Sequence, residues 1–135
     1  MSQPEIFRSQ PPPPLQPRPI AIPAARETVL PNGLTVVVVE DTRLPLVSYR
    51  LAFRVGGAFD PPDVPGLTDL LAGLLPEGTA SKSSRELADE VARMGASLSA
   101  GATSDYTIVA ASALASFNDQ ILGLMAEIVL QPSFP

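Results

Sequence analysis

The sequence predicts an α+β fold, a two-layer sandwich in which helices cover one face of a mainly antiparallel β-sheet. Its 135 residues allow one domain of ordinary size, and 45% hydrophobic residues are enough for a core. Paired strand-like segments alternate with segments of helical periodicity. In chain order we expect strands at 35–39 and 46–55, helices at 66–75 and 84–94, strands at 96–102 and 106–114, and a helix from about 116.

Composition excludes several functional classes. The net charge is −5 and the nine basic residues are scattered, which argues against nucleic-acid binding. The absence of Cys removes disulfides and thiolate sites. The longest apolar stretch, Ile121–Leu130, is interrupted by Glu127 and is about half a membrane span, so no membrane-spanning helix is expected.

The first part of the chain differs from the rest. Nine of the sixteen prolines lie in the first 31 residues, which favours extended polyproline II structure. We therefore expect residues 1–26 to be a Pro-rich arm or linker and residues 27–135 to form the domain. The arm is interpreted as a tether, with a ligand for a Pro-recognition module or a segment docking on a partner subunit as alternatives. No signal peptide is evident; a Pro-rich tether suits an exported protein, so a bacterial periplasmic or cell-envelope location with the signal removed is expected.

The first strands are justified by turn chemistry and alternation. Asn32-Gly33 is a hairpin signal before Thr35–Val39, whose four valines favour a strand. In Leu46–Val55, apolar residues alternate with Ser, Arg and Ala, as in a strand with one buried face. Gly56-Gly57 then begins a loop.

The first helix, Gly66–Leu75, carries leucines at i, i+3, i+4, i+7 and i+8, which predicts an apolar packing face. At 100° per residue, Asp69, Ala72 and Gly73 fall together on the opposite side. That side is expected to face solvent or a cleft. Gly73 within a helix costs about 1 kcal/mol against Ala, and helix propensity gives no reason for it.

The other two helices differ in the strength of their start signals. Ser83 and Glu86 fit a capping box, and Gly95 stands where a left-handed residue ends a helix. The last helix is expected to start near Ser116 with Asp119 as a weaker box partner, and to stop before a proline. The residues that we expect it to bury are Phe117, Ile121, Leu124, Met125 and Ile128.

Several short motifs occur in an order that resembles the N-terminal part of an insulinase/pitrilysin-like zinc peptidase, the family that includes mitochondrial processing peptidase. No single motif is specific, but the ordered set is, and it covers about residues 27–135. The resemblance implies that this chain is half of a larger lobe and the N-terminal part of a longer protein. The motifs are Leu30–Val38, Val55–Ala58, Pro65–Asp69, Glu77–Thr79, Gly95–Ala100 and Gln131–Pro135.

The zinc motif of that family, H-x-x-E-H, is replaced in this chain. The resemblance places the two His positions on Asp69 and Gly73 and the catalytic Glu on Ala72, and the sequence has no His at all. Zinc in a catalytic site needs about three protein ligands, and Ala72 cannot act as a base. The family's third ligand is a Glu in a later helix, for which Glu77 is a poor substitute. We therefore expect no catalytic residue, no metal site and no cofactor.

A second feature of the family, a strand that binds the substrate peptide, has a matching segment in this chain. The resemblance implies that the strand after the second helix accepts substrate as an added β-strand. An ordinary sheet strand under a helix, or a subunit contact, are the alternatives. The matching residues are Leu98, Ser99, Ala100, Gly101 and Ala102.

The favoured hypothesis is an inactive peptidase-like subunit, or a fragment of one, that pairs with a zinc-bearing homologous subunit and helps form a peptide-binding chamber. The alternatives are a stand-alone structural or interaction module derived from the peptidase fold, and a metallopeptidase using a different metal site. Alone, the chain is expected to expose an apolar patch and an open sheet edge, and therefore to self-associate.

Overall fold

The strands of the predicted sandwich are divided between two sheets. The computed structural model describes residues 14–17, 20 and 22–135, and the chain separates into two units, Met1–Asp41 and Thr42–Pro135. Most of the expected Pro-rich arm lies outside the described residues, and the expected boundary near residue 27 falls inside a strand. The units are therefore considered separately.

The first unit contains a two-stranded antiparallel hairpin, β1 (Ala25–Val29) and β2 (Thr35–Val39). Its turn forms as predicted: Gly33 has a φ of 84°, and the side chain of Asn32 accepts a hydrogen bond from the Leu34 amide at 3.1 Å. The strand β1 was not predicted from the sequence.

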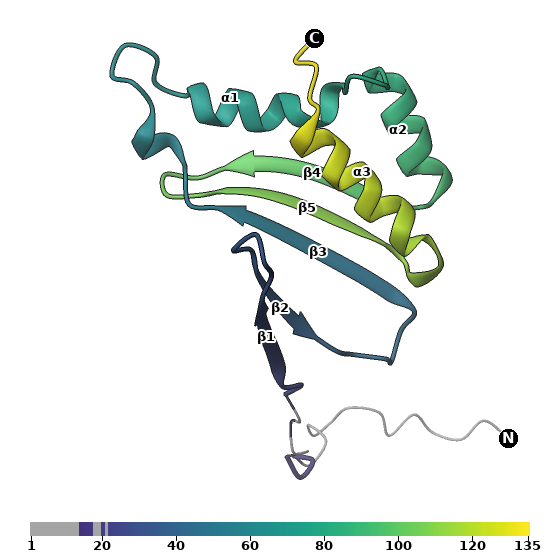
Figure 1. The fold of residues 1–135 in the computed structure, drawn as a ribbon. Helices are drawn as coiled ribbons and strands as arrows, with labels where there is room; N and C mark the ends of the chain where they lie inside the picture. The colour runs from purple at the N-terminus through teal and green to yellow at the C-terminus, as the bar shows by residue number, and fades with distance from the viewer. Residues whose placement is uncertain (1–13, 18–19, 21) are drawn as a thin grey trace, which may run out of the picture. The chain divides into compact units, whose positions relative to one another are not determined.

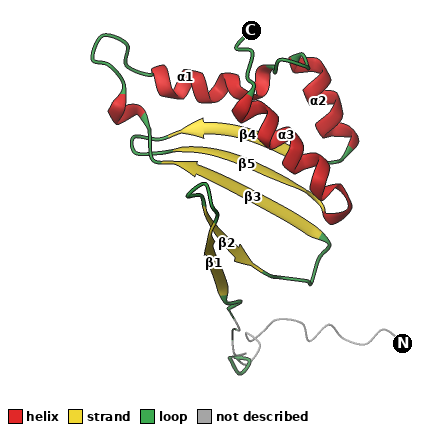
Figure 2. Ribbon diagram, viewed as in Figure 1, coloured by secondary structure: helices red, strands yellow, loops and turns green. Residues whose placement is uncertain are grey.

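The second unit is the two-layer sandwich, and its fold class is confirmed. Its sheet has the order β3-β5-β4 with antiparallel pairing throughout, and its helices α1, α2 and α3 lie on one side of the sheet (Figure 1). Short 3-10 turns η1, η2 and η3 join these elements (Figure 2). The bounds are β3 Leu46–Phe53, η1 Gly57–Phe59, α1 Leu67–Leu74, η2 Leu75–Glu77, α2 Ser84–Arg93, β4 Ser97–Ala102, β5 Thr107–Leu114, η3 Ala115–Phe117 and α3 Asn118–Leu130.

The register of the three strands explains where the core lies. Alternate residues of β5 face the helices, and the residues paired with them on β3 and β4 face the same way, because directly opposite residues share a face. On the other face most pairs are small or polar, apart from Leu46–Leu114 and the pairs of Ile108. There Ser97 and Ser112 share a hydrogen bond of 2.8 Å. The buried core residues are Leu87, Met94, Val109, Ala111, Ala113, Ile121, Leu124, Met125 and Ile128.

The predicted N-terminal cap is present on α2 and absent on α3. Ser83 caps α2, and the reciprocal capping box with Glu86 is confirmed. The expected box of Ser116 and Asp119 is wrong: α3 begins at Asn118 after η3, and no side chain caps it. Tight winding through η3 places Ser116 before the first α-helical turn, where its hydroxyl does not meet the helix amides.

The predicted orientation of α1 is wrong in part. Asp69 and Gly73 are exposed as expected and Leu74 and Leu75 are half-buried, but Ala72 and the other leucines differ from the prediction. The leucine face of α1 is largely exposed, with exposed fractions of 61% at Leu70 and 40% at Leu71, whereas Ala72 is buried at 2%. The helix lies against β4 and β5, and the small Ala72 side chain allows a close approach to the sheet. Periodicity identified an apolar face correctly, but it does not say which side of a short helix meets the sheet.

Within the part of the chain that the structure describes, no helix is both long and apolar enough to cross a bilayer.

Candidate functional site

The helix that would carry the zinc motif is started by a side chain from the preceding loop. Gly66 adopts a φ of 88° and offers no side chain as a cap. Asp60 takes that role: its carboxylate accepts hydrogen bonds from the amides of Gly66 at 2.8 Å and Thr68 at 3.0 Å, and from the Thr68 hydroxyl. The Thr68 hydroxyl is the main cause that lowers the pKa of Asp60 below its usual value, and the backbone amides add to it. Asp60 therefore holds a charge at the positive end of α1.

The three positions at which the resemblance places the zinc motif do not converge. Asp69 and Gly73 are exposed, one turn apart on α1, whereas Ala72 is turned away from solvent. Asp69 supplies one carboxylate to this face, and Gly73 supplies no side chain. Among residues 14–17, 20 and 22–135, no group of three His, Cys, Asp or Glu side chains is placed to hold a metal ion. As arranged here, the face offers one oxygen ligand, which does not make a zinc site.

Gly73→Ala is expected to stabilise the chain by about 0.5–1 kcal/mol. Gly73 lies in a regular helix, and a Cβ added there would meet no atom within 4 Å. The gain would appear as a higher thermal midpoint by circular dichroism. Gly66→Ala is the matched control and is expected to destabilise, because Gly66 has a φ of 88°. A lower midpoint for Gly73→Ala would contradict the open surroundings of this position.

The segment predicted to bind peptide, Leu98–Ala102, forms most of β4. In the described part of the chain β4 pairs with β5 alone, so its other side is a sheet edge. Leu98, Ala100 and Ala102 are half-buried toward the helices, and the residues between them are exposed. The strand carries no charge and no Pro, which are the usual devices that prevent edge pairing.

A charged cluster that the sequence did not predict joins the segment before α2 to α3. The carboxylate of Glu127 accepts hydrogen bonds from the hydroxyls of Thr79, at 2.7 Å, and Ser81, and from the Lys82 ammonium at 2.7 Å. The Lys82 contact, followed by the two hydroxyls, lowers the pKa of Glu127 to about 2. Thr79 is buried, so its hydroxyl depends on this carboxylate. The cluster therefore ties the segment between η2 and α2 to α3.

Glu127→Gln is expected to lower the free energy of unfolding by about 1.5–3 kcal/mol at pH 7, the usual range for hydrogen bonds to a charged group. The pKa of Glu127 falls from 4.5 to about 2 on folding. The charge therefore stabilises fully above the unfolded pKa, and this stability is lost as the pH falls toward 2. Urea unfolding at pH 7 and pH 3 measures it, with the exposed Asp119→Asn on the same helix as control. A wild-type advantage that does not shrink at pH 3 would contradict the assignment.

Comparison with known proteins assigns the family. The sequence profile described as Insulinase (Peptidase family M16) matches residues 35–135. The chain belongs to the insulinase family. The resemblance seen in the ordered motifs is thereby confirmed.

Individual relatives of the insulinase type share the same region. The chain is 24% identical over 103 residues to YmxG, an uncharacterized zinc protease of Bacillus subtilis, a match that covers 76% of this chain and 25% of that protein. It is 26% identical over 115 residues to a probable mitochondrial-processing peptidase subunit beta of Arabidopsis thaliana, covering 85% of this chain and 22% of the relative.

Solved structures agree with this assignment. A peptidase M16 inactive domain from Pseudomonas fluorescens matches with a TM-score of 0.76 and 30% identity, over 82% of this chain and 27% of that one. A protease from Helicobacter pylori, at a TM-score of 0.74 and 23% identity, has the same fold over 83% of this chain and 27% of that one. The chain thus spans about a quarter of the length of the proteins it matches.

Proposed function

We propose that this chain is a non-catalytic peptidase-like unit that pairs with a zinc-bearing homologue and contributes a peptide-binding wall to a shared chamber. The observation that carries the proposal is the state of α1. The resemblance places the two zinc-binding His residues on Asp69 and Gly73 and the base on Ala72, which is buried. The fold is retained while the groups that would hold zinc and activate water are absent from these positions.

The peptide-binding part of the proposal rests on β4. In the described part of the chain, one side of β4 pairs with β5 and the other side has no strand partner. An extended peptide can add to such an edge through backbone hydrogen bonds that do not depend on its sequence. Apart from Leu98, the side chains of Ser97–Ala102 are small and leave space beside the backbone. We therefore place the peptide on β4, where it would run beside α1 and α2.

Pairing is tested by producing the chain together with a zinc-bearing insulinase-family protein from the same organism. We expect the two to co-purify and the peptidase activity of the zinc-bearing protein to rise in the complex. A zinc-bearing partner whose catalytic Glu is replaced by Gln is the control: the complex should persist without activity. Failure to co-purify, or activity unchanged by this chain, would contradict pairing. Chelator-sensitive cleavage by this chain alone would contradict the non-catalytic assignment.

Self-association of the isolated chain is the second part of the proposal. Leu67, Leu70 and Leu71 form an exposed apolar face on α1, and such faces are usually covered by another surface. Leu70→Glu places a charge at its most exposed leucine. Sedimentation should show a dimer or larger species for the wild type and a shift toward monomer for the variant. A wild type that stays monomeric at high concentration would contradict the proposal.

A further inference from the structure

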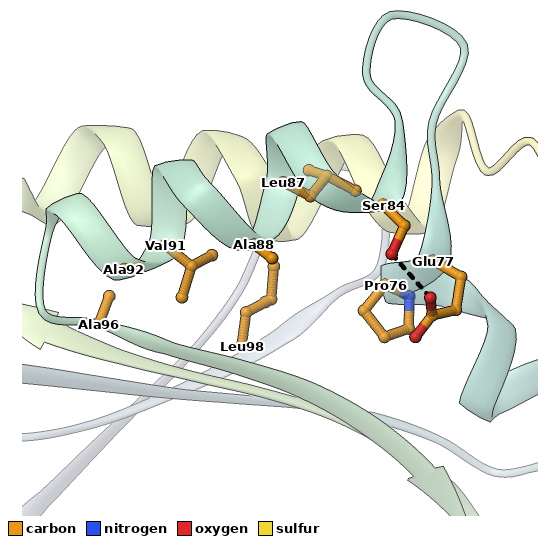
Figure 3. Close-up of a pocket in the computed structure, with 9 residues that line it drawn as sticks. All are labelled: Pro76, Glu77, Ser84, Leu87, Ala88, Val91, Ala92, Ala96 and Leu98. Carbon is orange, nitrogen blue, oxygen red and sulfur yellow. Dashed lines mark hydrogen bonds between the residues drawn. The ribbon is translucent and has the colours of Figure 1, made fainter.

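A hollow opens between α2 and the first half of β4. Its volume is about 380 Å³, in the lower part of the roughly 300–1,000 Å³ range of ligand sites. The walls are mostly apolar and are formed by Ala88 and Val91 of α2 and by Ala96 and Leu98 at the start of β4 (Figure 3). The hollow is therefore suited to an apolar group that arrives from the side of β4.

One charged group lies at the end of this hollow. The carboxylate of Glu77, in η2, accepts a hydrogen bond from the Ser84 hydroxyl at 2.8 Å, which holds it beside the first turn of α2 (Figure 3). Within the described residues Glu77 has no cationic partner, since the nearby Lys82 and Arg85 pair with Glu127 and Asp89. The carboxylate is thus positioned and still open to a positive charge.

The pleat of β4 fixes which residues of an added strand would reach these groups. Leu98 points into the hollow (Figure 3), and directly opposite residues on neighbouring strands point to the same face. A peptide residue opposite Leu98 would therefore enter the hollow, with its Cβ about 4.5–5.5 Å from that of Leu98. The next peptide residue on this face lies opposite Ala100. In Figure 3, Ala96, Leu98 and Glu77 follow one another in the direction in which β4 runs, so this residue approaches the carboxylate.

We propose that the hollow is a side-chain pocket for a peptide bound on β4. It takes an aliphatic side chain opposite Leu98, and Glu77 pairs with a Lys or Arg opposite Ala100. We take the added strand to be antiparallel, like the strands of this sheet, so that the basic residue precedes the aliphatic one in a basic-x-aliphatic order. This inference rests on the proposed strand addition at β4 and assigns its preferred peptide class.

The test uses the full chain and short labelled peptides of Gly, Ser and Thr that carry Lys-x-Leu, followed by fluorescence anisotropy at low salt. Replacing the peptide Leu by Gly should weaken binding about tenfold, because an aliphatic side chain loses its pocket. Glu77→Gln should weaken the Lys-x-Leu peptide about two- to fivefold, as for an exposed ion pair. It should not affect a peptide with norleucine in place of Lys.

Three further arms complete the design. Ala88→Leu fills the hollow from an exposed position of α2 and should remove the preference for Leu over Gly. Asp119→Asn, an exposed carboxylate on α3 that does not line the hollow, is the control and should change nothing. Methylation of the peptide backbone amides should abolish binding of every peptide, because strand addition needs these donors.

The outcomes separate the pocket from the strand addition. Binding that needs backbone amides but ignores Glu77→Gln and Ala88→Leu overturns the pocket and leaves the proposed peptide edge intact. Binding that survives backbone methylation and still responds to Glu77→Gln and Ala88→Leu supports the pocket and contradicts strand addition. No binding of any peptide overturns both.

Discussion

Ala72→Glu is expected to destabilise the chain by about 3 kcal/mol or more, enough to unfold a marginal domain. Ala72 is 2% exposed and is the one buried residue of α1, on a helix that lies against β4 and β5. A carboxylate there would be removed from water without a charged partner. Urea unfolding followed by circular dichroism measures the loss.

Gly73→Glu is the control for this substitution. It adds the same side chain one residue further along α1, where a Cβ meets no atom within 4 Å, so it should stay near the wild type. Equal stability of the two variants would place Ala72 on the solvent side of the helix. The expected difference also means that rebuilding H-x-x-E-H in this chain would place its Glu against the sheet.

Gly56→Ala is expected to be the second severe substitution, costing about 3 kcal/mol, at the upper end for overpacking. A Cβ on Gly56 would lie 2.4 Å from the carbonyl oxygen of Thr103 and 2.6 Å from both the Ser104 oxygen and the Tyr106 nitrogen. All three are backbone atoms of the β4–β5 turn, which cannot move aside like a flexible side chain. Thermal unfolding of the variant measures the cost.

Gly57→Ala is the matched control for Gly56→Ala. A Cβ on Gly57 would lie 3.8 Å from the Thr103 carbonyl oxygen, which is an ordinary contact. The Gly57 amide donates a hydrogen bond of 2.8 Å to the same oxygen, and the substitution should leave this bond intact. We expect a loss below about 1 kcal/mol. If both variants lose the same stability, the close approach of the β4–β5 turn to Gly56 does not explain why a glycine stands there.

The sequence predicted those elements whose determinants are local. The Ser83–Glu86 box, the left-handed Gly95 and the alternation of Val47, Tyr49 and Leu51 all depend on residues within a few positions, and the structure has each of them. The family and the order of its motifs followed from the same short segments. The helix that holds Asp69, Ala72 and Gly73 was also predicted from local periodicity.

Contacts between distant segments were not predictable from the sequence. Asp60 caps a helix that starts several residues later, and Glu127 meets Thr79 and Lys82 across more than forty residues. Neither Asp60 nor Glu127 belongs to a local sequence motif that would have indicated its partners. The side of α1 that meets the sheet was missed for a related reason: burial of a small Ala depends on what lies opposite, which periodicity does not contain.

The central place of β5 has a consequence for deuterium uptake. β5 is hydrogen-bonded to β3 and to β4, whereas in the described part of the chain β4 is bonded on one side alone. In heavy water the amides of β5 should exchange slowest, and every second amide of β4 should exchange fast, because it points away from β5. A peptide that adds to β4 would slow this alternate set and leave β5 unchanged. Uniform protection of β4 without peptide would mean that its outer side is already covered.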